Sequence, residues 1–568
     1  MAEEDQTAVT SASDPSRRET VGMLVGAIAL TTADTIAAAA TPSSFLHGVA
    51  SGDPTTDSVV LWTRVTTAAA SAAVRWEMSR DPAFRVVDKY GTVTADAERD
   101  HTVKVAPGGL KPGEIYHYRF WLGEEVSPVG RARTLPVGRL DRLGLALASC
   151  SNYALGYFNA YEAIANDPEI EFILHTGDYI YEHANDTSRR SSYFVRPCQP
   201  VHETVSLADY RLRHATHKAD PQSQRMHAMH PLLALWDDHD VANDSWRGGA
   251  ENHHPATQGD WEVRKAAAIQ AYFEWMPVRE PNQGEASADF WRTYSFGDLA
   301  TLVTLETRLT ARSQQVDYGR YKEALKTTAE RDTFVRDVLG DPAREMMAPA
   351  MAAALSQALS KSVRERQPWR IIGNGVLLSR VCTPDLRKAG ITPDAYPPIA
   401  LLDKFTDVMW RSDRTLPQST DSWDGYGAAR DRFYGLCHDV GATDLLVLTG
   451  DSHCFWSNDL TDAKGAAMGI EIGTAGVSIP NDFALAGCGS DLIKKIDALY
   501  VDANDDVRWT SGQHRGYVRI VLHPTHTRAT FIAVETARPG VLRQAILRRE
   551  EIVRRGTRSL ARSPGAVG

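Results

Sequence analysis

Residues 142–183 constrain the fold more than any other part of this 568-residue chain. An apolar run over residues 143–148 stops at a polar tip, and a segment with aromatic and aliphatic residues at helical spacing follows over residues 156–165. A second apolar run, residues 171–175, stops at another polar tip. Short apolar runs bounded by turns predict buried strands, so the order is strand, tip, helix, strand, tip. This order is typical of an α/β sheet.

Side chains that can bind a metal stand at these strand ends. Cys150 follows the first strand, and Asp178 and Tyr181 follow the second. Ligands of an open α/β sheet collect outside the carboxyl ends of its strands, so we expect these three residues on one rim. Three later apolar runs end in the same way: residues 232–236 at Asp237-Asp238-His239-Asp240, residues 371–372 at Gly373-Asn374, and residues 445–448 at Thr449-Gly450-Asp451-Ser452-His453. One such tip can be a structural turn, but five together predict a metal site.

The donors at these tips fall into two chemical kinds. A thiolate, a phenolate and an imidazole suit Fe(III) or another transition metal, and Cys150, Tyr181 and His453 supply them. A harder, oxygen-rich half-site would come from Asp238, Asp451 and Asn374. Asp178, at a Gly-Asp tip, is suited to bridge both ions. Two ions held close together can neutralise a phosphate and supply a hydroxide for in-line attack.

Three further residues are candidates for contacts with a substrate. His239 follows two acids and can point at the substrate, where it would protonate the leaving alkoxide as a general acid; the alternatives are a metal ligand or a structural hydrogen bond. Arg211 could hold phosphate oxygens, or could only pair with a nearby acid. Asn243 opens a Gly-rich loop, residues 243–253, that is suited to act as a lid.

The first 42 residues have the features of an export signal. Arg17 and Arg18 precede an apolar run over residues 21–30, and small residues follow at 37–40. This resembles a twin-arginine signal, which implies the twin-arginine export machinery as a partner and a secreted or extracytoplasmic protein. The alternative is a disordered tail with a chance arginine pair. The apolar run is too short to span a bilayer, and no stable membrane anchor is expected later in the chain.

The rest of the chain divides into three predicted parts. Residues 43–136 alternate short apolar segments with turns, which predicts a small β-sandwich. There Tyr116 follows residues 110–113 as in the corner of a fibronectin-like domain, where a tyrosine hydroxyl bonds back to the loop. Residues 137–540 would form the catalytic domain. Residues 541–568 form a basic C-terminal tail, in which the stretch 546–564 is predicted as a solvated helix with a frayed tail, or else a contact surface.

Charge and cysteine usage exclude some classes of function. The formal net charge of −10 gives no general attraction for nucleic acid, so no nucleic-acid partner is expected. None of the six cysteines forms a CxxC pair, so neither a zinc ribbon nor a thioredoxin-like motif is indicated. Export would permit disulfides, but their pairing cannot be deduced.

Several spaced blocks carry a resemblance to a known family. They are residues 45–54, 177–182, 236–239 and 421–426, together with Gly450-Asp451-x-His453. The pattern resembles the metallophosphoesterases, with Asp238 and Asp451 at positions usually held by Asn and His. Those exchanges, with Ser149-Cys150 in place of an Asp-x-His opening, resemble the alkaline phosphatase D (PhoD) branch of that superfamily.

The resemblance implies a fold, an activity and a set of ligands. The fold would be a four-layer αββα metallophosphoesterase domain behind a small fibronectin- or immunoglobulin-like β-sandwich, and the activity hydrolysis of phosphate esters as an alkaline phosphatase. Fe(III) would be bound by Cys150, Asp178, Tyr181 and His453, and Ca²⁺ by Asp178, Asp238, Asn374 and Asp451, with Asp237 as a further calcium ligand. Gly375 and Glu306 depart from the family pattern, on the substrate side of the site.

Two other functions compete with the phosphatase. The same architecture serves phosphodiesterases that act on phospholipids, with a phospholipase D-type activity. A different class is a cell-surface binding module whose metal domain is inert. That class would have broken ligand tips, and none of the five is broken.

Overall fold

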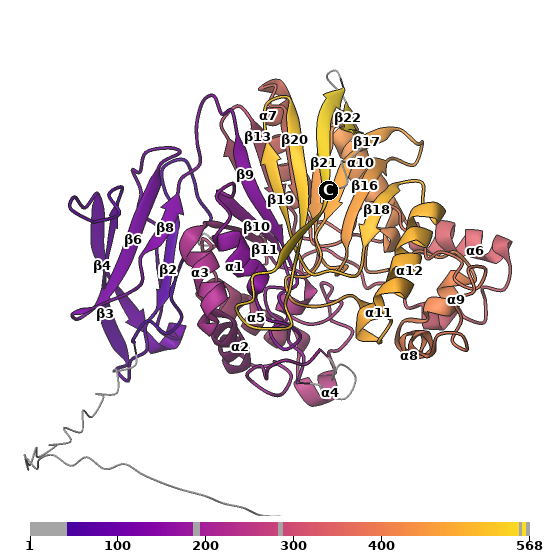
Figure 1. Cartoon of the computed structure of the whole chain (residues 1–568), viewed down its shortest axis with the longest axis horizontal. Helices are drawn as coiled ribbons and strands as arrows, with labels where there is room; N and C mark the ends of the chain where they lie inside the picture. The colour runs from indigo at the N-terminus through magenta and orange to yellow at the C-terminus, as the bar shows by residue number, and fades with distance from the viewer. Residues whose placement is uncertain (1–42, 186–192, 282–287, 556–558, 564–568) are drawn as a thin grey trace, which may run out of the picture. The chain divides into compact units, whose positions relative to one another are not determined.

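A computed structural model describes residues 43–185, 193–281, 288–555 and 559–563 (Figure 1). The predicted export signal, residues 1–42, lies outside the described residues.

Strands β9 (Leu143–Ala148), β10 (Phe172–Thr176) and β11 (Leu232–Leu235) form the parallel centre of the first large sheet. Every residue of the three strands is buried, which explains why they read as continuous apolar runs rather than as alternating ones. Antiparallel strands extend one side of the sheet: β19 (Gly516–Leu522), β20 (His526–Val534), β21 (Gln544–Arg555) and β22 (Ser559–Ser563). On the other side lie β1 (Val49–Gly52), β2 (Val60–Arg64) and β5 (Thr102–Val105).

A second large sheet carries the remaining two predicted tips. Its parallel centre is β13 (Ala300–Thr304), β14 (Trp369–Gly373), β15 (Leu445–Thr449) and β17 (Ala467–Gly473). Antiparallel strands complete it: β12 (Arg292–Phe296), β16 (Phe455–Thr461) and β18 (Val507–Ser511). The five tips therefore come from two sheets rather than from one.

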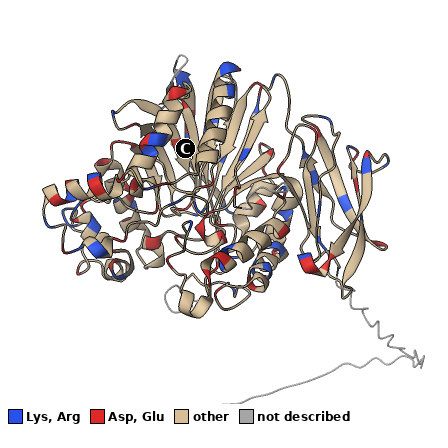
Figure 2. Cartoon of the chain, turned by 180° about the vertical axis from the view of Figure 1, so that it is seen from behind, with Lys and Arg blue, Asp and Glu red and all other residues tan. Residues whose placement is uncertain are grey.

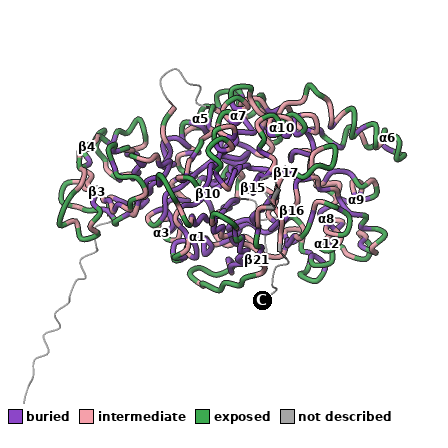
Figure 3. Tube along the Cα trace, turned by 90° about the horizontal axis from the view of Figure 1, so that it is seen from above, coloured by how far each residue is buried: buried purple, intermediate pink, exposed green. Residues whose placement is uncertain are grey.

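The two sheets pack face to face, with helices on their outer faces. Leu145, Leu174 and Leu233 of the first sheet meet Leu302 and Ile371 of the second in one buried cluster. Helices α1 (Asn159–Ala165), α3 (Pro221–Met229) and α5 (Trp261–Trp275) cover the first sheet, and α7 (Pro349–Arg364) and α10 (Gly427–Asp439) cover the second. This is the predicted αββα arrangement, with β10 and β15 in its buried interior (Figure 3).

The N-terminal strands form a sandwich-like region that shares one of its sheets with the catalytic part. A five-stranded sheet of described residues contains β3 (Ser71–Ser79), β4 (Lys89–Asp96), β6 (Ile115–Leu122), β7 (Glu125–Val126) and β8 (Gly130–Arg133). Its inner face packs on Val49 and Leu61 of the first large sheet. The Lys111 N–H donates to the Tyr116 hydroxyl over 2.9 Å, which confirms the predicted tyrosine corner.

Within the described residues, the basic C-terminal segment forms a pair of strands, so the predicted solvated helix is wrong. β21 pairs with β20 along its length, and β22 pairs with β21. Glu550 and Ile552 point to the same buried face, because residues two apart in a strand share a side. Arg548 and Arg562 form ion pairs with the buried Glu550. These basic side chains therefore make internal contacts, which the density of charge along the sequence does not reveal.

A group of helices packs against β16 and β18 of the second sheet. They are α8 (Pro397–Thr406), α9 (Val408–Ser412), α11 (Asp482–Leu485) and α12 (Ser490–Ala503). The other helices are α2 (Leu207–Ala219), α4 (Pro255–Gln258) and α6 (Thr328–Phe334). Within the described residues, none of the helices is both long and apolar enough to cross a membrane. Acidic and basic residues are interspersed over the helices and strands of the described chain (Figure 2).

Candidate metal centre

The carboxyl ends of the two sheets bring three of the predicted ligands together. Potential ligand atoms of Cys150, Asp178 and His453 all lie within 4.8 Å of one another, although they follow β9, β10 and β15. The Tyr181 hydroxyl donates to Asp178 Oδ2 over 2.9 Å and lies 3.2 Å from His453 Nε2. The four predicted donors of the softer half-site therefore meet at one place.

The oxygen-rich donors meet beside them. Ligand oxygens of Asp237, Asp238 and Asp451 lie within 4.8 Å of one another. Asn374 is fully buried at the end of β14, and its Nδ2 donates to the Val376 carbonyl over 2.5 Å, which leaves Oδ1 without a partner among the described residues. We call Asp178, Asp237, Asp238 and Asp451 the acidic rim.

The backbone at these tips adopts conformations that ordinary residues avoid. Cys150, Asp178, Asp451 and His453 have φ of 59°, 54°, 60° and 55°. Each left-handed residue costs about 1–2 kcal/mol, and such strain persists only where the surroundings impose it. Gly177 has φ 96°, and a Cβ there would lie 2.4 Å from the Asp237 backbone nitrogen, so only glycine fits before Asp178.

Asp240 holds the Asp178 tip in place. Its carboxylate accepts hydrogen bonds from the backbone N–H groups of Asp178 over 2.9 Å and Tyr179 over 3.1 Å. It also accepts one from the N–H of Asp237 over 2.9 Å, so the two adjacent strand tips share one carboxylate. Burial raises the pKa of Asp240 to about 7.

The electrostatics of the acidic rim fit a site for cations. Burial, together with neighbouring carboxylates, raises the pKa of Asp178 and Asp451 well above the ordinary range, and burial raises that of Asp237 to about 6. Buried oxygens without a hydrogen-bond partner remain on three of these acids, namely Asp178 Oδ1, Asp237 Oδ2 and Asp238 Oδ1. Crowded, unsatisfied carboxylates are costly to bury unless a positive charge joins them, so the donors fit the implied metals.

Arg308 supplies one positive charge that sequence reasoning missed. Its guanidinium is fully buried, pairs with Asp237 and with Asp421 over 2.6 Å, and lies 3.3 Å from Asp238. It lies 3.7 Å from Asp451. The sequence contained a signal for Arg308, because residues 306–308 follow the end of β13 as the other polar tips follow the ends of their strands.

Glu182 is the second functional residue that sequence reasoning missed. It is fully buried, and its Oε2 lies 2.7 Å from His239 Nδ1. Burial alone would lower the pKa of His239, but the charges of Glu182, Asp238 and Asp178 outweigh it and raise that pKa well above the usual range. The Tyr181 ring packs on the His239 ring with centroids 4.3 Å apart. Glu182 therefore orients His239 and favours its protonated form at the edge of the site.

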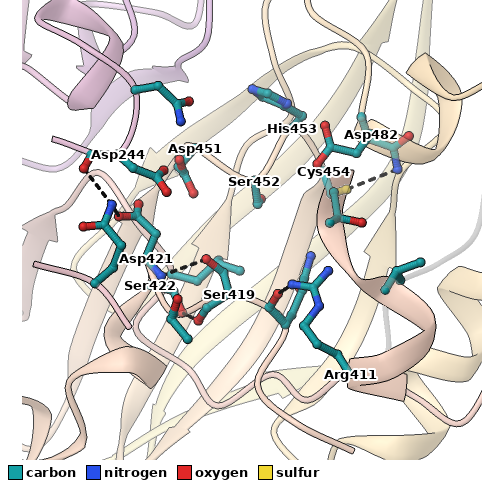
Figure 4. A pocket seen from close by; sticks show the side chains of 18 of the residues that line it. Asp244, Arg411, Ser419, Asp421, Ser422, Asp451, Ser452, His453, Cys454 and Asp482 are labelled. Carbon is teal, nitrogen blue, oxygen red and sulfur yellow. Dashed lines mark hydrogen bonds between the residues drawn. The ribbon is translucent and has the colours of Figure 1, made fainter. Parts of the chain in front are cut away.

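A cavity of about 770 Å³ opens beside these residues (Figure 4). Asp238, His239, Asn243, Asp451 and His453 all line it. The Asn243 N–H donates to Glu182 Oε1 over 2.7 Å, so the loop that begins there adjoins the site.

Arg211 does not belong to this site, and its predicted role in binding substrate is wrong. It does not line the cavity, and its guanidinium donates to both oxygens of the buried Glu274 carboxylate over 2.7 Å. The paired acid lies in α5, which spacing along the sequence could not reveal. Arg211 therefore has the alternative role, that of pairing with a nearby acid.

Comparison with known proteins agrees with this geometry. The family model for the PhoD-like phosphatase matches residues 145–531, and the model for the N-terminal domain of that family matches residues 30–136. The chain belongs to the PhoD-like phosphatase family. As a PhoD-like phosphatase, it is a phosphoric ester hydrolase.

Two known proteins illustrate the membership. The chain is 29% identical to the alkaline phosphatase D of Bacillus subtilis (strain 168) over 504 residues, which cover 86% of this chain and 77% of the relative. A solved structure of PhoD matches with a TM-score of 0.74 and 26% identity, over 92% of this chain and 93% of that one. The PhoD-like fold therefore extends over nearly the whole chain.

Proposed function

We propose that this PhoD-like phosphatase acts as an alkaline phosphatase with Fe(III) and Ca²⁺ at the candidate metal centre. Fe(III) would be held by Cys150, Asp178, Tyr181 and His453, and Ca²⁺ by Asp178, Asp238, Asn374 and Asp451. The observation that carries the proposal is the convergence of thiol, phenol, imidazole and carboxylate groups from both sheets. When bound, such a pair of cations neutralises a phosphate and activates water for in-line attack.

Residues of the chain would handle the leaving group. His239 lines the cavity, and its Nδ1 is occupied by Glu182, so Nε2 is the nitrogen left to donate a proton to the departing alkoxide. Glu182 acts as a positioning residue, because it fixes the ring and favours the protonated form. Asp178 would help to hold the cations that supply this chemistry.

The acid role of His239 has a specific kinetic signature. His239→Ala should lose roughly 10²–10⁴-fold in rate on alkyl phosphates, whose leaving groups need a proton, and far less on 4-nitrophenyl phosphate. The metal content of the variant should match that of the wild type. Equal losses on both classes of ester would reject the acid role, and loss of metal would make His239 a ligand instead.

Iron at the softer half-site should colour the protein. A thiolate or phenolate bound to Fe(III) absorbs visible light by charge transfer, and Cys150 and Tyr181 are the donors involved. Tyr181→Phe should shift or abolish the band while the fold is retained. A colourless preparation with full activity would rule iron out of this half-site.

A phosphodiesterase or phospholipase D-type activity is the second candidate. The cavity, at about 770 Å³, has room for much more than a phosphate group, which favours a substrate with a large organic part. Turnover of 4-nitrophenyl phosphate against that of phosphatidylcholine separates the two activities.

We further propose export through the twin-arginine route, which would make the protein secreted or extracytoplasmic. The motif around Arg17 and Arg18 supports it, and that route carries folded proteins with their metals already bound. Replacing both with Lys should retain the active protein inside a host that has the pathway. Unchanged extracellular activity would overturn the export proposal and leave the catalytic one intact.

A further inference from the structure

The cavity continues beyond the metal centre into a second region that the proposed chemistry does not use. This region, which we call the apolar arm, lies among α8, α9, α11 and α12 and is lined by Leu377, Val381, Leu402, Val408, Trp456 and Tyr500. These side chains belong to one packed cluster. The arm opens into the same cavity as Asp451 and His453, so an organic group attached to a phosphate there can enter it.

One cationic side chain stands in the wall of this arm. Arg411, on α9, lines the cavity, and one end of its guanidinium donates to the Gln418 carbonyl. Its Nε is buried without a hydrogen-bond partner, and among the described residues no carboxylate lies within ion-pair distance of it. In Figure 4 Arg411 lies well apart from Asp244 and Asp451.

Three of the acidic residues that line the same cavity are paired with basic side chains. Asp407 pairs with Lys322 over 2.5 Å, Asp424 with Arg430 over 2.6 Å, and Asp421 with Arg308 over 2.6 Å. A half-buried guanidinium beside apolar groups is costly unless an anion joins it. A ligand with an anionic group would supply that partner, while its apolar part would cover the arm.

We propose that the apolar arm binds the alcohol part of the phosphate ester, and that Arg411 binds an anionic group carried by that alcohol. The substrate class is therefore an ester whose leaving group has an apolar body ending in a carboxylate or a second phosphate. The guanidinium fork matches either group through paired hydrogen bonds, and its contact with Gln418 fixes its direction. This inference rests on the proposed phosphatase function.

A matched substrate series tests the assignment. The ratio of kcat/KM for ω-carboxyalkyl phosphates over alkyl phosphates of equal chain length is measured for the wild type, and the same ratio for ω-phosphoalkyl phosphates separates the two anionic groups. The wild type should prefer an anionic ester at the chain length that reaches Arg411. Arg411→Met should lower the ratio by about 10- to 100-fold, the value of a charge-assisted hydrogen bond, and Arg411→Lys should restore part of it.

Arg320→Met is the matched control, because Arg320 lines the same cavity but is exposed and adjacent to Asp317. It should keep the wild-type ratio. Thermal unfolding of each variant checks that it folds.

The outcomes separate this inference from the function on which it rests. Hydrolysis without preference at any chain length overturns the role of Arg411 and leaves the phosphatase proposal standing. If no ester is hydrolysed, the proposed phosphatase function is wrong. The role of the apolar arm is then tested by calorimetry, which compares the binding of ω-carboxyalkyl phosphonates with that of alkyl phosphonates. Tighter binding of the carboxyalkyl phosphonates that is lost in Arg411→Met supports the role of Arg411, and equal binding of the two kinds of phosphonate by the wild type overturns it.

Discussion

The acidic rim and a second buried group of ionisable residues respond to burial in opposite ways. The second group, which we call the base cluster, lies on β10, α2 and α3 and consists of His175, His214, His217, Lys218 and His227. Lys218 Nζ lies 2.7 Å from His227 Nε2, and among the described residues no carboxylate forms an ion pair with it. Burial lowers the pKa of His175 and His217 to about 3 and that of Lys218 well below its usual range.

The difference shows which cluster needs a ligand. Buried bases become neutral by losing a proton and then need no counter-ion, and in the base cluster the Tyr179 hydroxyl lies 2.9 Å from His227 Nε2. Asp178 and Asp451 of the rim, whose pKa values are raised well above the ordinary range, would have to hold protons at neutral pH or find cations. We infer that the base cluster is structural and propose that the rim is functional.

The largest expected effect comes from removing one rim carboxylate. Asp178→Asn should lower kcat/KM roughly a thousandfold or more, because losing the bridging ligand forfeits several kcal/mol of transition-state stabilisation at ~1.4 kcal/mol per tenfold. The matched control is Asp444→Asn, which removes an acid paired with Arg370 over 2.5 Å immediately before β15, away from the rim. Comparable losses of specific activity in folded samples of both variants would remove the distinction between rim and scaffold.

Cations should stabilise the protein through the rim alone. Adding metal to chelator-treated protein should raise the free energy of unfolding by about 2.7 kcal/mol at a hundred times Kd, measured by denaturant titration. Asp451→Asn should reduce this gain, because it removes a rim carboxylate from the site. A gain of the same size in that variant would place the bound cation elsewhere.

Glu182→Gln should weaken catalysis by about 10- to 100-fold, as a positioning residue does, and should also change its pH profile. Glu182 raises the pKa of His239, and the acid must be protonated to act. The alkaline limb of kcat should therefore move to lower pH in the variant. An unmoved limb would mean that another group supplies the proton.

The base cluster predicts a loss of stability on acidification. Burial lowers the pKa of Lys218 in the folded state below its value of 10.5 in the unfolded state, so the unfolded chain binds this proton more readily. The free energy of unfolding is therefore highest above pH 10.5 and decreases as the pH falls below it. The histidines act in the same sense below 6.5, the ordinary pKa of a histidine. Lys218→Met should flatten the slope of unfolding free energy between neutral pH and about 10 by up to ~1.4 kcal/mol per pH unit. Lys322→Met, at an exposed ion pair, should not; an equally flattened slope there would contradict this reading.

Local pattern was enough to predict much of the scaffold. Residues 143–148 form β9 with the predicted bounds, and residues 445–448 lie within β15, because strands buried on both faces must be apolar throughout. The tyrosine corner at Tyr116 was predictable for a different reason, because its hydrogen bond joins residues close together in the sequence. The tips of both sheets were recognisable one by one, although not their distribution over two sheets.

What sequence could not supply depends on long-range contacts. Glu182 and His239 meet across 57 positions, and Arg308 and Asp421 across 113, so no spacing along the chain marks them as partners. Arg211 was misassigned because Glu274, which neutralises it, lies in a different helix. The C-terminal strands were mistaken for a helix because an arginine-rich segment is expected to be exposed to solvent. The sequence did not show that Glu550 is buried and pairs with Arg548.

The most direct test of the metal centre is the metal content of purified, fully active protein, measured beside its activity during chelation. Two equivalents of metal per chain should be present, and activity should fall as they are removed and return when they are restored. In Asp178→Asn the stoichiometry and the activity should fall together. Full activity in protein stripped of metal would contradict the account.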